Sequence, residues 1–313
     1  MIEEKKVLVT GGAGFIGTHL VERLCEQNEV HVLDNLSAGD RERVPEEAVF
    51  HEADLMRPEQ IDEALDSDFD TVFHLAANPD VKLGAEDTRM HTEQNVVATL
   101  NLLESMRENG VDEIVFTSTS TVYGEDVPFP TPETYGPLEP ISLYGASKLA
   151  CEGLCTSFEG TFGVEATVYR LANIVGGDGH GVVPDFVRKL RDDPERLEIL
   201  GDGRQRKSYL HVSDCVDAML LGVEGDETIY NIGSDDTVSV TRIAEVVSEE
   251  MDLEPEFEYT GGRRGWKGDV PRMRLSVERI ESLGWEPSWN SEESVRKATR
   301  EMLETPSTGQ SDG

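Results

Sequence analysis

The glycine-rich stretch at residues 7–17, VLVTGGAGFIG, constrains the fold of this chain more than any other part of it. Its first four residues are apolar or β-branched, which predicts a buried parallel strand, and apolar residues recur at helical spacing after Gly14. Gly12, Gly14 and Gly17 have the spacing G-x-G-x-x-G, which suits a turn of positive φ, a backbone close to a pyrophosphate, and a helix packed tightly on its strand. The N-terminus of such a helix offers free N–H groups and a positive dipole end to phosphates. The stretch predicts a dinucleotide site, with an ordinary strand-to-helix turn as the alternative.

An acidic residue, Asp34, follows the next apolar run at residues 30–33. A carboxylate at this place accepts hydrogen bonds from the ribose 2′-hydroxyl and repels the 2′-phosphate of NADP. The sequence therefore predicts NAD as the cofactor. Arg41 and Arg43 follow closely and could pair with a phosphate, which keeps NADP as the alternative. A turn-capping role for Asp34 is compatible with ribose binding.

The order of apolar segments predicts an α/β fold with a Rossmann-type, doubly wound parallel sheet. Short apolar strands alternate with amphipathic helices after Asp34, and 313 residues are enough for two lobes. Segments richer in Gly, Pro and charge predict a smaller α/β substrate-binding lobe. We expect residues 1–172 plus 211–237 to form the NAD-binding Rossmann domain, residues 173–210 plus 238–304 to form the substrate-binding lobe, and residues 305–313 to be a disordered tail.

The chain carries a formal net charge of −35, from 63 acidic and 28 basic residues. Such a charge repels nucleic acid and anionic lipid, so we expect neither as a partner. It also destabilises the compact state by self-repulsion, which high salt screens, and this predicts a halophilic source. An ordinary acidic surface is the alternative. No apolar run reaches membrane-spanning length and no signal peptide is evident, so we expect a cytoplasmic protein.

Four cysteines, Cys25, Cys151, Cys155 and Cys215, are scattered along the chain. Cys151 and Cys155 lie four residues apart, but no histidine or further cysteine accompanies them at metal-binding spacing. We expect buried thiols and no metal.

Tyr144 and Lys148 stand four apart at the start of a predicted helix, so their side chains share one face. A free phenol has a pKa of about 10 and is a poor base at neutral pH, but a nearby ammonium lowers that pKa. Tyr144 could then accept the proton of a sugar hydroxyl while the cofactor accepts hydride. By itself Y-x-x-x-K is more often a surface contact. Here it follows a dinucleotide turn and the hydroxyl-rich residues 117–120, TSTS, which favours a catalytic role.

The motifs TGGAGFIG, DNLSAG, HLAA, TSTSTVYG and YGASK, in this order and spacing, resemble the extended short-chain dehydrogenase/reductase family. Within it the chain is similar to nucleotide-sugar epimerases of the UDP-glucose 4-epimerase type. The resemblance extends through LGWEP at residues 283–287. It implies Thr119 as the catalytic hydroxyl, Tyr144 as the base, and Lys148 as the residue that lowers the pKa of the base and holds the nicotinamide ribose.

The resemblance also implies cofactor and substrate contacts. Those to NAD are expected from the turn, the loops after three strands, and the catalytic residues: Gly11, Gly14, Phe15, Ile16, Gly17, Asp34, Asn35, Leu36, Ser37, Asp54, Leu55, Leu75, Ala76, Ala77, Asn95, Ser118, Tyr144 and Lys148. Those to the substrate are expected from Thr119, Asn173, Val183, Arg206, Lys207 and Arg264. A strand-end cap is the alternative role for Asn173.

The substrate end departs from the family pattern. The segment GDGRQRKSYLHV places Lys207 and Ser208 where relatives usually have Arg and Asp. Further on, Trp266 stands where an Arg is usual, two residues before Gly-Asp, and Arg264 lies two positions earlier. The basic residues of these two segments are exceptions in an acidic chain, and their positive charges suit a dianionic diphosphate.

One position separates the subfamilies that the resemblance covers. Dehydratases and decarboxylases carry an acidic residue just after the catalytic hydroxyl, whereas this chain has Ser120 and Thr121. The expected reaction is therefore NAD-dependent epimerisation at carbon 4 of a nucleotide sugar, most simply UDP-glucose/UDP-galactose or their N-acetyl forms, through a transient 4-keto intermediate. Another enzyme of the same fold and a non-catalytic NAD-binding protein are the alternatives. Helices at residues 95–108 and 143–162 have apolar stripes, and the resemblance implies that they pair in a homodimer.

Overall fold

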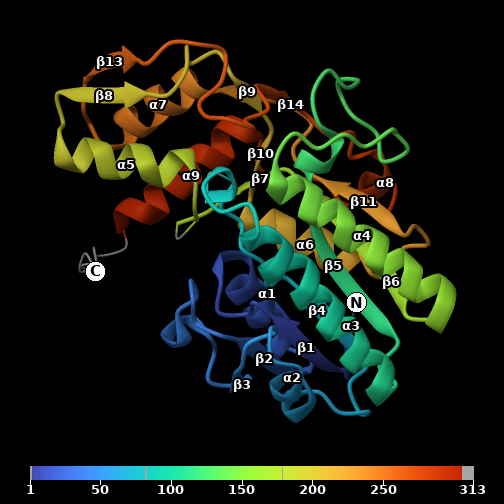
Figure 1. The fold of residues 1–313 in the computed structure, drawn as a ribbon. Coiled ribbons are helices and arrows are strands. Elements are labelled where there is room, and N and C mark those ends of the chain that lie inside the picture. The colour runs from blue at the N-terminus through green and yellow to red at the C-terminus, as the bar shows by residue number, and fades with distance from the viewer. Residues whose placement is uncertain (1, 82, 178, 305–313) are drawn as a thin grey trace.

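The computed structural model describes residues 2–81, 83–177 and 179–304, so the predicted disordered tail at 305–313 lies outside the described residues. A seven-stranded sheet forms its centre, in the order β11-β6-β5-β4-β1-β2-β3, and every neighbouring pair is parallel (Figure 1). The strands are β1 (Lys6–Thr10), β2 (Glu29–Asp34), β3 (Val49–Glu52), β4 (Thr71–His74), β5 (Glu113–Thr119), β6 (Glu165–Leu171) and β11 (Ile229–Ile232). The predicted doubly wound sheet is confirmed.

Helices cover both faces of this sheet because its strands are apolar on both sides. Val7 and Val9 of β1 pack with one set of helices, while Leu8 between them packs with the other. The first set is α1 (Phe15–Cys25), α6 (Val212–Gly222) and α8 (Glu278–Glu281), and the second is α2 (Pro58–Ala64), α3 (Ala98–Asn109) and α4 (Leu143–Phe162). The helix expected from residue 95 begins with a π-helical turn, η3 (Thr92–Val97). Three short 3₁₀ turns complete this part: η1 (Arg41–Arg43), η2 (Leu83–Ala85) and η4 (Ser120–Tyr123).

A second lobe is built around three helices that share one apolar core, α5 (Val182–Asp192), α7 (Val240–Glu250) and α9 (Ser291–Glu304) (Figure 1). Its strands form three small sheets: β7 (Asn173–Val175) with β10 (Tyr209–His211), β8 (Arg196–Ile199) with β13 (Glu256–Tyr259), and β9 (Arg206–Lys207) between β12 (Val238–Ser239) and β14 (Arg272–Met273). Val277, Ile280 and Trp285 pack instead into the core that contains β1 and α1. The chain therefore returns to the large sheet before it forms α9.

The strand order reverses between β1 and β4, which places the turn after β1 beside the loop after β4. Leu75 N donates to Thr10 O at 3.0 Å across this point. Thr119 ends β5, which is the neighbour of β4, and α4 begins nearby because Ser142 Oγ caps it by accepting from Gly145 N at 3.1 Å. The fold therefore gathers the predicted motifs at the carboxyl edge of the sheet.

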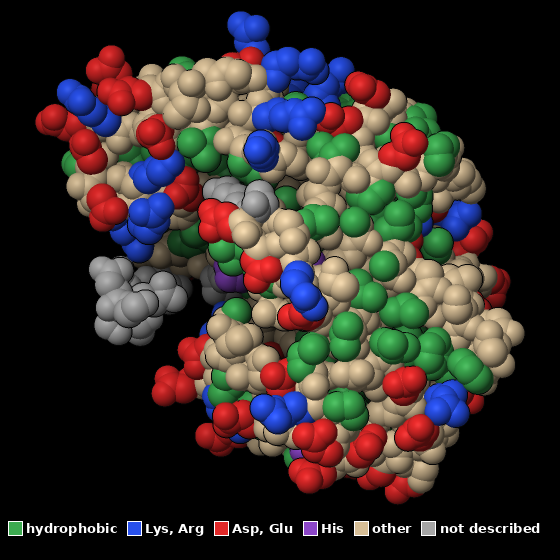
Figure 2. Space-filling model, in the orientation of Figure 1, with side chains coloured by type: hydrophobic (Ala, Val, Ile, Leu, Met, Phe, Trp, Pro, Cys, Tyr) green, Lys and Arg blue, Asp and Glu red, His purple; other side chains and the backbone are tan. Residues whose placement is uncertain are grey.

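The cysteines, the surface charges and the helices can be compared with the expectations drawn from composition. The four cysteines are free thiols, with Cys151, Cys155 and Cys215 buried and Cys25 partly buried, as expected. Asp and Glu side chains crowd the lower face of the molecule in Figure 2, while Lys and Arg gather mainly on the upper lobe. Among the described helices, none has the length and apolar character needed to cross a membrane.

Candidate active site

The glycine turn after β1 is packed too tightly for side chains. Gly11 has φ +70°, and a Cβ there would lie 2.6 Å from Ala76 N. A Cβ on Gly17 would lie 2.1 Å from Gly11 O. The assignment of the positive-φ role to Gly12 is wrong, because the chain reverses at Gly11, and a Cβ on Gly12 would instead meet the Val32 side chain at 2.7 Å.

The N-terminus of α1 is open toward this turn. Gly14 is its N-cap, no side chain caps the helix, and its first turn contains no acidic residue. The first N–H groups and the positive dipole end are therefore available for an anion, which fits a pyrophosphate. Phe15 and Ile16 follow; the Phe15 ring is buried and packs against Gly176 and Gly179 of the second lobe. Ile16 packs on the apolar core, which leaves its backbone for a cofactor contact.

Asp34 ends β2 beside the glycine turn and is 9% exposed. Its Oδ2 accepts from Ala13 N at 3.0 Å and its Oδ1 accepts from Leu36 N at 2.8 Å. The carboxylate thus caps the turn, and its remaining lone pairs are those a ribose hydroxyl could use. Asn35 and Ser37 are exposed in the loop that follows, joined by a 3.0 Å hydrogen bond from Ser37 N to Asn35 Oδ1.

Both arginines that kept NADP open are engaged with the protein. Arg41 lies over the Phe50 ring, 4.6 Å from its centroid, and also donates to Val44 O. Arg43 donates to Thr18 Oγ1 at 3.0 Å. Both guanidinium groups, which could have paired with the 2′-phosphate of NADP, therefore already contact protein groups.

The other predicted cofactor contacts line the neighbouring strand ends. Leu75, Ala76 and Ala77 form the partly buried loop after β4 that touches Gly11. Asp54 follows β3 and its Oδ1 accepts from Met56 N at 2.9 Å, while Leu55 is buried. The buried Asn95 holds that region together, as its Oδ1 accepts from Asn78 N at 2.8 Å and its Nδ2 donates to Ser147 Oγ at 3.0 Å. The side chain of Asn95 is thus already bonded to protein.

The three predicted catalytic residues lie together at the junction of β5 and α4. Thr119 Oγ1 accepts from Thr121 N at 3.3 Å and from Thr121 Oγ1 at 3.2 Å, and a side-chain hydrogen bond joins Thr119 to Tyr144. Lys148 Nζ donates to Thr117 O at 2.7 Å and lies 4.7 Å from the centroid of the Phe116 ring. Lys148 is 3% exposed and Thr119 is 8% exposed. The arrangement provides a phenol and a hydroxyl beside a buried ammonium.

The pKa values in this structure differ from the expectation for Tyr144. Burial raises the pKa of Tyr144 to about 12 because it disfavours the phenolate, and the hydrogen bond to Thr119 opposes that shift. Burial lowers the pKa of Lys148 to about 8. The predicted lowering of the phenol pKa by Lys148 is therefore wrong, since desolvation sets the direction of the shift and Lys148 is not among its causes.

Sequence reasoning missed side chains that surround these three. Ser118, expected to contact the cofactor, instead donates its hydroxyl to the buried carboxylate of Glu152. Glu152 follows Lys148 by four residues on α4, so the helical spacing that links Tyr144 to Lys148 was the signal for it. The buried His91 was missed as well, and its ring lies 5.7 Å from that of Tyr144.

Two predicted substrate residues are fixed within the second lobe. Asn173 Nδ2 donates to Ser208 O at 2.9 Å, which joins β7 to the strand end before β10 and agrees with a strand-end cap. Val183 is fully buried in the apolar core of that lobe, near the N-terminus of α5. Because the whole residue is 0% exposed, neither the side chain nor the backbone of Val183 is open to a substrate in this structure.

Arg206 and Lys207 are neighbours on β9, so their side chains point to opposite faces. Lys207 Nζ lies 2.5 Å from Asp269 Oδ1 and 5.1 Å from the centroid of Trp266. Gly268, which precedes Asp269, lies against the start of α4, because a Cβ there would lie 3.4 Å from Ser142 Cβ. Arg206 points the other way and donates to Thr237 O at 3.0 Å, so the two basic side chains lie on opposite faces of β9.

Arg264 is exposed and pairs with a residue of the other lobe. Its Nη2 lies 2.6 Å from Glu125 Oε2, in the segment just after η4. Arg264 therefore reaches the segment after η4, where the carboxylate of Glu125 already binds it. A phosphate there would have to compete with Glu125.

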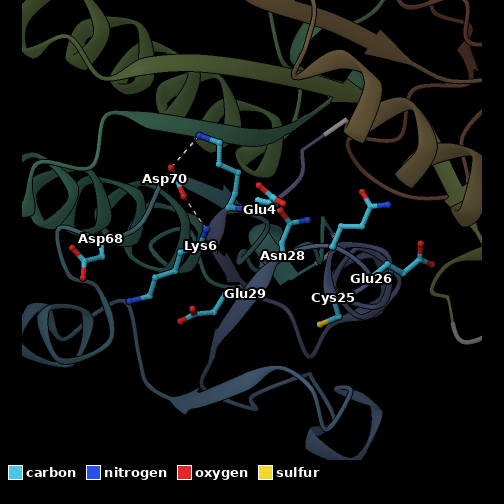
Figure 3. Close-up of a pocket in the computed structure, with 10 residues that line it drawn as sticks. Glu4, Lys6, Cys25, Glu26, Asn28, Glu29, Asp68 and Asp70 are labelled. Carbon is cyan, nitrogen blue, oxygen red and sulfur yellow. Dashed lines mark hydrogen bonds and ion pairs between the residues drawn. The ribbon is translucent and has the colours of Figure 1, made fainter.

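A separate depression lies at the amino edge of the sheet, remote from these residues (Figure 3). It has a volume of about 780 Å³ and is bordered by the starts of β1 and β2. Asp70 in this depression accepts from Lys5 Nζ at 3.0 Å and from Lys6 N at 2.8 Å. Its carboxylate therefore joins the residue before β4 to the start of β1. Sheets of this type bind ligands at the carboxyl edge, which favours the site around Tyr144.

Residues 7–233 match the NAD dependent epimerase/dehydratase family. A crystal structure of a UDP-galactose 4-epimerase is 43% identical with a TM-score of 0.87, covering 95% of this chain and 98% of that one. The Thermus thermophilus UDP-glucose 4-epimerase in complex with NAD is 35% identical with a TM-score of 0.86, covering 96% of this chain and 100% of that one. The Corynebacterium glutamicum UDP-glucose 4-epimerase is 33% identical over 90% of this chain and 91% of its own length.

Proposed function

The chain belongs to the NAD dependent epimerase/dehydratase family and is an NAD-dependent enzyme of the extended short-chain dehydrogenase/reductase type, and on that premise we propose that it epimerises a UDP-hexose at carbon 4. The substrate pair would be UDP-glucose and UDP-galactose or their N-acetyl forms. The observation that carries the proposal is the Thr119, Tyr144 and Lys148 cluster at the strand ends beside the glycine turn. Similarity to 4-epimerases along nearly the whole chain supports carbon 4.

Tyr144 is the proposed base of this reaction. Its phenolate oxygen accepts the proton of the 4-hydroxyl, and the Thr119 hydroxyl hydrogen-bonds the same sugar oxygen. When bound, oxidised NAD supplies the hydride acceptor and a positive charge near the phenol. Because burial raises the pKa of Tyr144 to about 12 even with the opposing hydrogen bond to Thr119, a positive charge next to the phenol is needed to bring that pKa toward neutrality. Lys148 stays fixed to Thr117 O and holds the nicotinamide ribose.

The substrate's own balance closes within the site. The sugar gives the proton of its 4-hydroxyl to Tyr144 and would give the hydride of carbon 4 to bound NAD, which leaves the 4-keto sugar. After the ketone turns, the hydride would return to the other face of carbon 4 and the proton to its oxygen. No carboxylate stands at residues 120 and 121, so an acid for eliminating water is missing there. Lys207 and Asn173 are proposed to hold the diphosphate while the sugar rotates, and Arg264 contributes once it leaves Glu125.

Incubation of the purified protein with UDP-, GDP- and dTDP-sugars tests the proposal. We expect one UDP-hexose pair to interconvert without added cofactor, and Tyr144→Phe to lower turnover by about 10²- to 10⁴-fold with bound NAD retained. Stoichiometric consumption of added NADH would identify a net reductase. A product lighter by one water would identify a dehydratase, and no turnover despite bound NAD would support a non-catalytic NAD-binding protein.

We also propose the domain division and the dimer predicted from the sequence. The separate apolar core of α5, α7 and α9 supports a substrate-binding lobe at residues 173–210 plus 238–304, apart from the segment around Ile280 that packs on the large sheet. Exposed Leu143 and Phe162 at the two ends of α4 support pairing of α3 and α4 with a second copy. Sedimentation in molar KCl would distinguish a monomer from a homodimer.

A further inference from the structure

A third residue continues the stripe that Tyr144 and Lys148 begin on α4. Glu152 lies four residues beyond Lys148, and each member of the stripe contacts the end of β5. Tyr144 bonds the Thr119 side chain, Lys148 donates to Thr117 O, and Glu152 accepts from the Ser118 hydroxyl. Three consecutive residues of the strand are therefore attached to one face of the helix.

Glu152 is itself held by an arginine from the next strand. Arg170 of β6 is the register partner of Ser118, and it grips the carboxylate with Nε to Oε1 at 3.1 Å and Nη2 to Oε2 at 2.7 Å. Glu152 is 5% exposed and Arg170 is 3% exposed. The bidentate geometry fixes the position of the carboxylate that Ser118 contacts.

The same guanidinium also holds the chain beyond Thr119. Arg170 Nη1 donates to Tyr123 Oη at 3.0 Å, and Tyr123 Oη donates to Asn231 Oδ1 at 2.7 Å. Tyr123 ends the turn η4, which starts immediately after Thr119. Residues on both sides of the catalytic hydroxyl thus depend on Arg170, one through Glu152 and one directly.

A buried ion pair is poor evidence for stability, because desolvating two charges offsets most of their attraction. The contacts of this pair instead converge on the backbone around Thr119. Resting on the proposed epimerase function, we propose that Glu152 and Arg170 are positioning residues that set the Thr119 hydroxyl against the Tyr144 phenol. They act through Ser118 and Tyr123 and touch neither sugar nor cofactor.

The double variant E152L/R170M tests this, because it removes both charges together and so leaves neither member of the pair buried without its partner. We expect it to fold, to retain NAD, and to lose up to about 100-fold in kcat with KM for the wild-type substrate within about twofold, since small misplacements of reacting groups have effects of this size. Glu152→Asp, which keeps the charge, should recover part of kcat. Tyr123→Phe should lower kcat less than the double variant does.

Glu250→Gln is the matched control, because it breaks the ion pairs of Glu250 with Arg296 and Arg300 in the other lobe, at 2.6 and 2.7 Å. It should leave kcat unchanged. A folded, NAD-loaded E152L/R170M with wild-type kcat would overturn the positioning role, and so would a loss of activity that merely follows lost NAD. Absence of turnover in the wild type would instead refute the proposed function, so the two failures are distinguishable.

Discussion

Replacement of Gly17 by alanine tests the assignment of the cofactor turn. An alanine Cβ would lie 2.1 Å from Gly11 O and 2.8 Å from Gly12 Cα, and both are backbone atoms that cannot rotate away. Either α1 must move off the turn or the turn must open. Both movements displace the N–H groups at the start of α1 that we assign to the pyrophosphate.

The expected magnitude follows from two opposing effects. Overpacking a tight contact costs about 1–3 kcal/mol, whereas alanine gains about 1 kcal/mol over glycine within a helix. Gly17→Ala should therefore lower the free energy of unfolding by up to about 2 kcal/mol. Displacement of the phosphate site should weaken NAD binding by at least about tenfold, which corresponds to about 1.4 kcal/mol.

Bound NAD per protomer after purification and the thermal midpoint in molar KCl are the two measurements. Gly160→Ala is the matched control, because Gly160 lies on α4, is exposed, and has no atom within 4 Å of a built Cβ. It should stabilise the protein slightly and keep its NAD. A Gly17→Ala protein with full NAD content and a midpoint equal to that of Gly160→Ala would refute the assignment of the turn.

Three further predictions concern pH, salt and substrate affinity. Burial lowers the pKa of His74 to about 3, so between about pH 6.5 and 3 the unfolded state binds one proton more than the folded state. The free energy of unfolding should therefore fall as the pH falls, by up to about 1.4 kcal/mol per pH unit. Urea titrations at pH 7.5 and 5.5 should show a smaller loss of stability for His74→Gln than for wild type. With a net charge of −35, the urea midpoint should be higher in molar KCl than in dilute buffer, and equal midpoints would contradict the halophilic interpretation. Lys207→Met should raise KM for the sugar nucleotide about tenfold or more with little change in kcat, because charged hydrogen bonds contribute about 1.5–3 kcal/mol; an unchanged KM would remove Lys207 from the diphosphate site.

Most of the fold could be predicted from local patterns in the sequence. Apolar runs, helical periodicity and glycine spacing act over a few residues, so the parallel sheet and its flanking helices were predictable, with element ends close to those observed. The pairing of Tyr144 with Lys148 was predictable for the same reason, because a four-residue spacing fixes a shared helix face. The positive φ was placed one residue late, at Gly12 instead of Gly11, since the spacing alone does not say where the chain reverses.

Contacts between distant segments could not be predicted. The bond from Ser118 to Glu152, the grip of Arg170 on that carboxylate, and the opposite directions of Arg206 and Lys207 depend on which strands become neighbours. The pKa of Tyr144 is set mainly by desolvation and by its hydrogen bond to Thr119, and the charge of Lys148, on which the sequence argument relied, is not among the causes of the shift.

The sequence by itself determined a glycine turn between a strand and a helix, an acidic residue at the end of the next strand and a Tyr-Lys pair on one helix face, because each is a short-range pattern of backbone geometry. Only the tertiary structure decided which polar side chains are hydrogen-bonded or ion-paired within the protein and which can bind a ligand. Burial and hydrogen bonding are set by the packing of strands and lobes that lie far apart in the chain, and these decide the charge state and direction of every group in the site.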